Sequence, residues 1–88
     1  MKYFEKKITV NNPNGVHSRV ATKLAQIASE NEVKLNIIYC DHVVDCSSVL
    51  DVLSMAFIYG SSFIVRADGE LSIKALCEVE KLFTRVDV

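Results

Sequence analysis

The segment Asn14–Arg19, with the sequence Asn-Gly-Val-His-Ser-Arg, holds the residue types of this chain that are best suited to chemistry. His17 falls where a cluster of turn-forming residues meets the predicted start of a helix. Backbone N–H groups at a helix N-terminus carry partial positive charge, which stabilises an anion and disfavours a protonated imidazole. The histidine then keeps one ring nitrogen as a nucleophile, and Arg19 offers several donors for phosphate oxygens. The segment therefore fits a transient phosphohistidine, although a histidine in a first helical turn beside a surface arginine is also common without such a role.

Ser48 is a second candidate site, because the sequence Ser48-Val49-Leu50-Asp51 predicts a capping box with Asp51 at the third helical position. One interpretation makes Ser48 a helix cap, and another makes it the target of a protein kinase. The two interpretations are compatible, because a phosphate at a helix N-terminus is electrostatically favourable. The neighbouring Ser47 has an equivalent hydroxyl, so the residue types alone leave the acceptor open.

The segment after Ser48 is rich in apolar residues, which make up eight of the ten positions from Val49 to Ile58. A short helix on one side of a sheet buries only one face, so some of these side chains should stay exposed. Exposed apolar patches mark sites for partners. The alternative is that a deep core or a homodimer covers them.

The three cysteines are Cys40, Cys46 and Cys77, and they form no CxxC pair. Cys40 and Cys46 together with His42 and Asp45 offer metal-binding atoms, but zinc sites usually place paired cysteines closer together and have a full set of ligands. A disulfide between Cys40 and Cys46 across a hairpin is disfavoured in a reducing compartment. We therefore expect no metal and no cofactor, and we interpret the cysteines as small buried side chains.

Composition places the chain among small globular proteins: it has 88 residues, of which 50% are hydrophobic and 24% charged, with a formal net charge of -1. We expect a single domain over residues 1–88. The net charge is close to zero, which excludes a protein that binds nucleic acid or anionic membranes through its overall positive charge. Residues 1–29 nevertheless contain five lysines and arginines against one glutamate, which fits a site for anionic groups. Without a long apolar run for a membrane span or a signal peptide, we expect a cytoplasmic monomer with no membrane insertion.

The periodicity of apolar residues predicts seven elements. Alternation predicts strands at Lys2–Val10, Glu32–Tyr39, His42–Cys46 and Phe63–Asp68. Spacing by three and four residues predicts helices from Ser18 to about Glu30, from the Ser48 cap to Gly60, and from Ala75 to Val86. The resulting order is βαββαβα. Because strands with one apolar face need cover on one side only, we predict an α+β open-faced β-sandwich: a four-stranded antiparallel sheet with three helices on one face.

Several motifs resemble, in order and spacing, those of HPr, the histidine-containing phosphocarrier family of the bacterial phosphoenolpyruvate-dependent sugar phosphotransferase system. The resemblance spans essentially the whole chain and rests on five motifs: Pro13–Arg19, Ser48–Leu50, Leu53–Met55, Gly60 and Ala67–Glu70. It implies an open-faced β-sandwich with three helices on one face, in agreement with the periodicity. It also implies a phosphoryl carrier, which forms a covalent intermediate but has no turnover of its own.

The resemblance assigns roles to the residues around the histidine. It implies that His17 receives a phosphoryl group on its Nδ1 atom from an Enzyme I-like donor and passes it to a IIA-type acceptor. Arg19 would hold the phosphoryl group, with the segment at Asn14, Ser18 and Val20 contributing to its binding. No further cofactor is implied.

The resemblance also assigns roles to the second helix. Ser48 matches the regulatory serine that an HPr kinase/phosphorylase modifies in some bacteria. Val49, Leu50 and Leu53 match the hydrophobic surface on which the partners dock.

Four features depart from the family pattern. Val20 stands where the family has a proline, which returns an N–H to the first turn of the helix. Ser47 replaces a common lysine, and Asp51 puts an acid where the family often has a small or basic residue. The dipeptide Cys40-Asp41 replaces a tight Asn-Gly turn. These departures fit a divergent paralogue.

Two other functions compete with phosphoryl transfer. The departures favour a regulatory binding module that acts mainly through phosphorylation of Ser48 and docking to a partner such as a transcriptional regulator. An unrelated α/β module that binds RNA or a metal is disfavoured, because Tyr3, Tyr39 and Phe63 do not form the aromatic and basic motif of an RNA-binding sheet.

Overall fold

A computed structural model describes residues 3–84 of the chain as four strands and three helices. In chain order these are β1 (Tyr3–Thr9), α1 (Ser18–Glu30), β2 (Lys34–Tyr39), β3 (His42–Asp45), α2 (Val49–Ser54), β4 (Ser62–Asp68) and α3 (Ser72–Thr84). Every strand pairing is antiparallel, and the order across the sheet is β1-β4-β2-β3. The predicted fold class and the predicted βαββαβα order are therefore confirmed.

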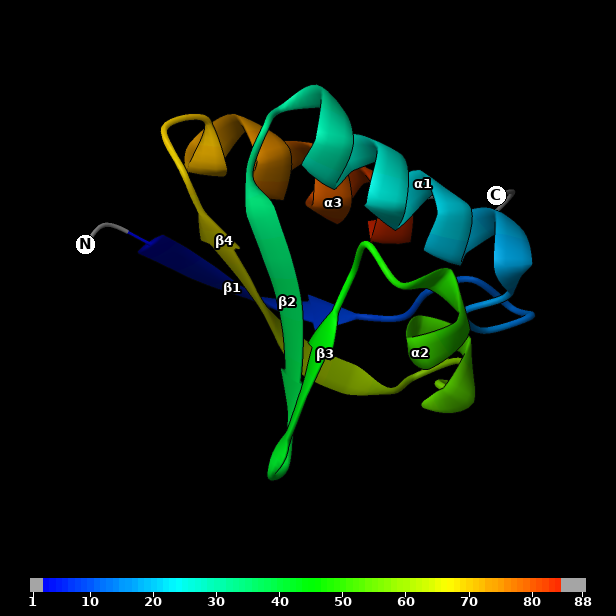
Figure 1. Ribbon diagram of the computed structural model, residues 1–88. Helices are drawn as coiled ribbons and strands as arrows, with labels where there is room; N and C mark the ends of the chain where they lie inside the picture. Colours follow the sequence, from blue (N-terminus) through cyan, green and yellow to red (C-terminus); the bar gives the residue numbers. More distant parts are fainter. Residues whose placement is uncertain (1–2, 85–88) are drawn as a thin grey trace.

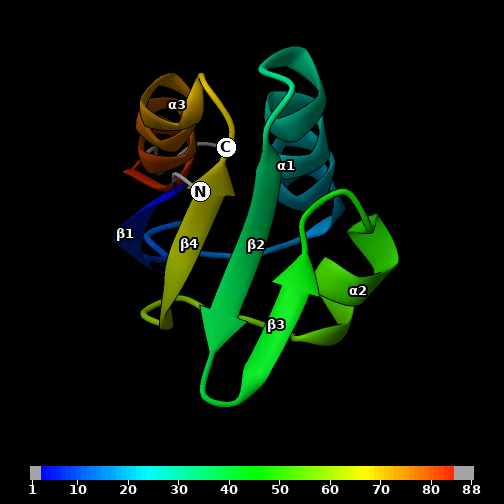
Figure 2. The same cartoon turned by 60° about the vertical axis from the view of Figure 1, so that its left-hand side comes forward.

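The helices lie on one side of the sheet, as Figures 1 and 2 show. Helix α3 packs on β1 and β4 beside α1, while α2 packs against α1 and β3. Alternate residues of the central strands point into this layer and are fully buried, among them Ile37 of β2 and Val65 of β4. Leu24 of α1 and Phe83 of α3 meet them from the other side. The alternating apolar residues of the strands and the regularly spaced apolar residues of the helices thus pack against each other in one core.

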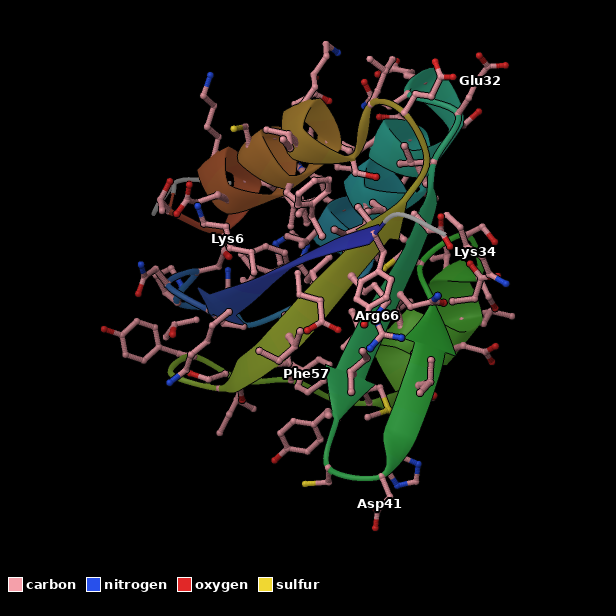
Figure 3. All side chains as sticks on the ribbon, turned by 90° about the vertical axis from the view of Figure 1, so that its left-hand side faces the viewer. Lys6, Glu32, Lys34, Asp41, Phe57 and Arg66 are labelled. Atoms are coloured by element: carbon pink, nitrogen blue, oxygen red, sulfur yellow. The ribbon has the colours of Figure 1, made fainter. Side chains whose placement is uncertain are left out.

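The opposite face of the sheet is open and faces the viewer in Figure 3. Arg66 of β4 lies on this face, where its guanidinium pairs with the Glu5 carboxylate at 2.6 Å. The same guanidinium lies 4.4 Å from the centre of the Tyr3 ring. Polar contacts of this kind suit a sheet surface in contact with water.

Helix α2 differs most from the prediction, because it ends at Ser54 with Met55 as its C-cap, and not at Gly60. Ala56 follows in the left-handed region with φ 54°, which a continuing helix does not allow. The predicted capping box is also wrong. Ser48 is the N-cap residue, but its side chain makes no capping hydrogen bond.

Other boundaries differ by a few residues. Strand β2 begins at Lys34 because Glu32 turns the chain with a φ of 52°, and α3 begins early, at Ser72. The predicted ends at Lys2 and Val86 lie outside the described residues. None of the helices within residues 3–84 combines the length and the apolar character that a membrane span requires.

The interpretation of the cysteines as buried holds for one of the three. Cys46 is buried just after β3, where its N–H donates to the Leu35 carbonyl at 2.9 Å, and burial raises the pKa of its thiol to about 12. Cys40 and Cys77 are exposed, so the interpretation is wrong for them. Cys40 forms the β2–β3 turn with Asp41, at the tip of the hairpin in Figure 3. No three metal-binding side chains gather within residues 3–84.

Candidate functional site

His17 is the N-cap residue of α1. Its backbone is extended, with φ -101° and ψ -178°, and its carbonyl accepts the first hydrogen bond of the helix from the Ala21 N–H at 3.0 Å. The imidazole turns back over the helix start, where Nδ1 accepts a hydrogen bond from the Arg19 N–H at 3.3 Å. A ring nitrogen that accepts a hydrogen bond holds a lone pair, so this geometry puts the proton of the neutral ring on Nε2. In the neutral ring the lone pair therefore lies on Nδ1.

The first turn of α1 presents backbone N–H groups beside this nitrogen. The Arg19 N–H bonds the imidazole, whereas the N–H groups of Ser18 and Val20 have no hydrogen-bond partner within the part of the chain that the structure describes. Val20 is fully buried, backbone included, so it does not present its N–H at the surface of the site. A proline at this position would lack that donor. An anion attached at Nδ1 would therefore meet the N–H groups of Ser18 and Arg19, two exposed residues at the positive end of the helix dipole.

The loop before His17 rests on the segment that follows α2. The Val16 N–H donates to the Phe57 carbonyl at 3.0 Å. Gly15 has a φ of 70°, and a Cβ at this position would lie 2.5 Å from the Phe57 carbonyl oxygen and 3.0 Å from the Ile58 Cα. Glycine is therefore required here both by the backbone conformation and by the close approach of a second backbone.

Phe57 in turn holds that segment in the core (Figure 3). Its ring lies edge-on to Tyr39, with centroids 5.2 Å apart, and tilted against Phe63 at 4.5 Å. Phe63 continues the series to Phe83 of α3 at 5.6 Å. The position of the histidine loop thus depends on a chain of aromatic contacts that crosses the core.

The structure brings the predicted residues of the first site together at one loop–helix junction. Asn14, Ser18 and Arg19 are exposed there beside the half-buried His17. A hydrogen bond from the Gly15 N–H to the Asn12 carbonyl, at 2.9 Å, closes the turn that carries Asn14.

The two serines before α2 have different surroundings. Asp45 accepts hydrogen bonds from the Ser47 N–H at 2.9 Å and from the Ser47 hydroxyl at 2.8 Å, and these bonds lower the pKa of the Asp45 carboxyl. The Ser48 N–H donates to the Asp45 carbonyl at 3.0 Å. The Ser48 hydroxyl is half-buried and has no hydrogen-bond partner within residues 3–84. Of the two hydroxyls, only that of Ser48 makes no hydrogen bond within residues 3–84, and we call it uncommitted.

The three residues predicted to form a docking surface lie differently in α2. Leu50 is 78% exposed, whereas Val49 and Leu53 are partly buried and pack against the core. Ile58, the last residue of the apolar segment in which exposed side chains are predicted, is 70% exposed, and Tyr59, just beyond that segment, is 62% exposed. Both residues lie beyond the end of α2, where the Ser61 N–H donates to the Ile58 carbonyl at 3.0 Å across a turn, and not in the helix that is predicted to reach Gly60.

Comparisons with known proteins point to a single family. Residues 4–85 match the family described as the PTS HPr component phosphorylation site. The phosphocarrier protein HPr of Treponema pallidum is 32% identical over 78 residues, which is 89% of this chain and 89% of that protein. The phosphocarrier protein NPr of Shewanella violacea is 30% identical over 80 residues, 88% of each chain.

Solved structures show the same fold. The crystal structure of a phosphocarrier protein HPr from Bacillus anthracis superposes with a TM-score of 0.85 at 22% identity, covering 94% of this chain and 99% of that chain. A histidine-containing phosphocarrier protein of Mycoplasma superposes with a TM-score of 0.73 at 27% identity, covering 92% of this chain and 90% of that chain.

Proposed function

The chain belongs to the HPr family of phosphocarrier proteins of the phosphotransferase system, and from this membership we propose that His17 receives a phosphoryl group from an Enzyme I-like donor and passes it to a IIA-type acceptor. Proteins of this family are phosphoryl carriers and not enzymes with turnover of their own. The single observation that supports His17 Nδ1 as the acceptor atom is its hydrogen bond from the Arg19 N–H at the start of α1.

The proposed step follows from this hydrogen bond. The Nδ1 lone pair attacks phosphorus, a P–N bond forms, and the bond between phosphorus and the donor breaks with its electron pair leaving on the donor. The proton on Nε2 stays in place. The Arg19 N–H loses Nδ1 as its acceptor and donates to a phosphoryl oxygen instead, joined by the N–H group of Ser18. The helix end thereby stabilises the new anion, and the reverse sequence releases it to an acceptor.

Phosphorylation of Ser48 is a second proposed role. It is supported by the uncommitted hydroxyl of Ser48, in contrast to the Ser47 hydroxyl, which Asp45 holds. A phosphate there would add about two negative charges to the surface that carries Leu50, and it would meet the carboxylate of Asp51. We expect such a modification, by an HPr kinase/phosphorylase, to alter docking at this surface. The alternative function is a regulatory module whose main activity is this modification and binding to a transcriptional regulator, in the cytoplasm.

One experiment separates these functions. The chain is incubated with phosphoenolpyruvate and the Enzyme I of its own source, and the stability of the adduct to acid is measured. We expect an acid-labile adduct that His17→Ala abolishes and Ser48→Ala leaves intact. Persistence of the labile adduct in His17→Ala would overturn the assignment. An adduct that is stable to acid, made with a serine kinase and lost in Ser48→Ala but not in the control Ser47→Ala, with little transfer through His17, would favour the regulatory module.

A further inference from the structure

The charged side chains of α1 and α2 form no ion pairs within the described residues. Residues 3–84 contain three ion pairs, and none of them involves α1 or α2: Lys6–Glu80, Arg66–Glu5 and Lys74–Glu78. Arg19 and Lys23 of α1 are exposed and make no ion pair within the described residues. The same holds for the carboxylate of Asp51 on α2. These charges remain available to a partner protein.

The uncommitted charges are separated by sign. Arg19 and Lys23 lie one helical turn apart, along a shallow depression of about 300 Å³ that they line together with Ser18, Thr22 and Gln26. Helix α1 contains no acidic residue before Glu30, at its far end. Across residues 46–61, by contrast, Asp51 is the only charged residue. A partner that approaches His17 therefore meets positive charge over α1 and negative charge over α2.

Apolar side chains accompany these charges. Leu50, the residue before Asp51, is 78% exposed, and Ile58 and Tyr59 beneath the histidine loop are 70% and 62% exposed. Apolar anchors bordered by charged side chains have the composition of a protein–protein interface. The first turn of a helix also favours an acid, which explains an acidic residue at position 51 but not the lack of any basic residue over residues 46–61.

We propose that Asp51 selects the partners of this chain by its charge, a proposal that rests on the function proposed above. The fitting partner surface has an apolar pocket for Leu50 with a lysine or arginine beside it, facing Asp51. The same surface has carboxylates facing Arg19 and Lys23. Charge complementarity of this kind affects the orientation of the partner and the association rate more than it affects the binding affinity. A partner whose surface is acidic throughout would face repulsion at α2 and associate slowly.

The test measures association with the full-length Enzyme I of the same source at low and high salt. The variants are Asp51→Asn, which removes the charge, and Asp51→Lys, which reverses it; Glu32→Lys is the matched control. Glu32 is an exposed acid beyond the far end of α1, roughly 20 Å from its first turn and distant from α2 in Figure 3. Urea unfolding of each variant shows whether it is folded.

We expect Asp51→Lys to lower the association rate constant about tenfold at low ionic strength, and Asp51→Asn about threefold. Both effects should shrink towards twofold near 1 M salt, where screening is nearly complete. Glu32→Lys should stay within about twofold of the unchanged chain. If Asp51→Lys destabilises α2, Asp51→Asn carries the test, with Asp51→Glu expected to restore the rate.

An unchanged or faster association of Asp51→Lys and Asp51→Asn would overturn the proposal, because it would mean that Enzyme I presents no basic group to α2. This failure differs from failure of the proposed function. If only the proposal for Asp51 fails, the unchanged chain still receives the phosphoryl group on His17. If the proposed function fails, the chain receives no phosphoryl group from Enzyme I, and the proposal for Asp51 is then overturned as well.

Discussion

The two ends of α1 use their polar groups in opposite ways. At the C-terminal end Asn31 is buried, and its side-chain amide donates to the Ile27 carbonyl at 2.9 Å and to the Glu78 carboxylate at 3.1 Å. Its side-chain oxygen accepts a hydrogen bond from the Lys74 ammonium at 2.8 Å. At the N-terminal end the Ser18 and Val20 N–H groups have no partner within the described residues, and the Arg19 N–H between them donates to His17 Nδ1.

The difference separates stability from function along a single helix. A buried polar group that is fully hydrogen-bonded holds two elements in one arrangement, here α1 and α3. A donor without a protein partner on an exposed residue, such as the Ser18 N–H, costs little because water reaches it, and it can bind an anion. We therefore expect substitutions at the Asn31 end to change the free energy of unfolding, and substitutions at the His17 end to change phosphoryl transfer.

Gly15 is the position where this separation should fail most clearly. Gly15→Ala must adopt a left-handed φ and move the Phe57 carbonyl, which lies 2.5 Å from the added Cβ. We expect a loss of about 3 kcal/mol in the free energy of unfolding, roughly 1 kcal/mol of it from the backbone conformation. The initial rate of His17 phosphorylation should fall at least about tenfold, because the histidine loop is displaced.

Gly60→Ala is the matched control for this substitution. Gly60 also has a left-handed φ, of 89°, but a Cβ there would have no atom within 4 Å. Urea unfolding should therefore show only the cost of the backbone conformation, about 1 kcal/mol. Equal losses for Gly15→Ala and Gly60→Ala would mean that contact with Phe57 does not position the loop.

Asn31→Ala tests the other end of the helix. It removes three hydrogen bonds and leaves the Ile27 carbonyl without its side-chain donor, so we expect a loss of about 2 kcal/mol in urea unfolding. Phosphorylation of His17 at a temperature where the variant is folded should stay within about twofold. Asn36→Ala, on a half-buried asparagine of β2 with no side-chain hydrogen bond within residues 3–84, should cost less than about 0.5 kcal/mol. A slow phosphoryl transfer in Asn31→Ala would contradict the separation of the two ends.

Most of the fold follows from local patterns, and so does the centre of the site. The alternation of apolar residues places all four strands, because one face of the sheet is buried and the other is not. The helical spacing likewise gives α1 its observed bounds, and the turn-forming residues before His17 give the histidine its place at the helix start.

The end of α2 could not be predicted in the same way, because tertiary contacts decide it. Gly60 is the natural stop in the sequence, but burial of Phe57 between Tyr39 and Phe63 takes the chain out of the helix earlier, at Ala56. This exit exposes Ile58 and Tyr59, so the same contacts that ended the helix also determined which residues border the site.

Ala56 is the residue at which that early exit is strained. Its φ of 54° lies in the region that glycine adopts freely after a helix, so Ala56→Gly should raise the free energy of unfolding by about 0.5–1 kcal/mol. Ala25→Gly, in the interior of α1, should lower it by about 1 kcal/mol. Thermal and urea unfolding measure both changes. A loss of stability in Ala56→Gly would show that the segment under the histidine loop is not held in a strained conformation.

Glu78 gives the smallest effect and the last test of the Asn31 end. A hydrogen bond from Lys74 and a second from Asn31 lower the pKa of the Glu78 carboxyl from its ordinary value of 4.5. A carboxyl with a lower pKa in the folded state contributes stability above the unfolded pKa and loses it as the pH falls through the folded pKa. Stability should therefore decline less between about pH 5 and pH 3 in Glu78→Gln than in the unchanged chain, by a few tenths of a kcal/mol, as expected for a partly exposed pair one helical turn apart. Because Asp45 also has a lowered pKa, and the variant retains it, the difference between the two urea-unfolding series isolates Glu78. Parallel declines would mean that the hydrogen bonds of Glu78 with Lys74 and Asn31 add no stability at this end.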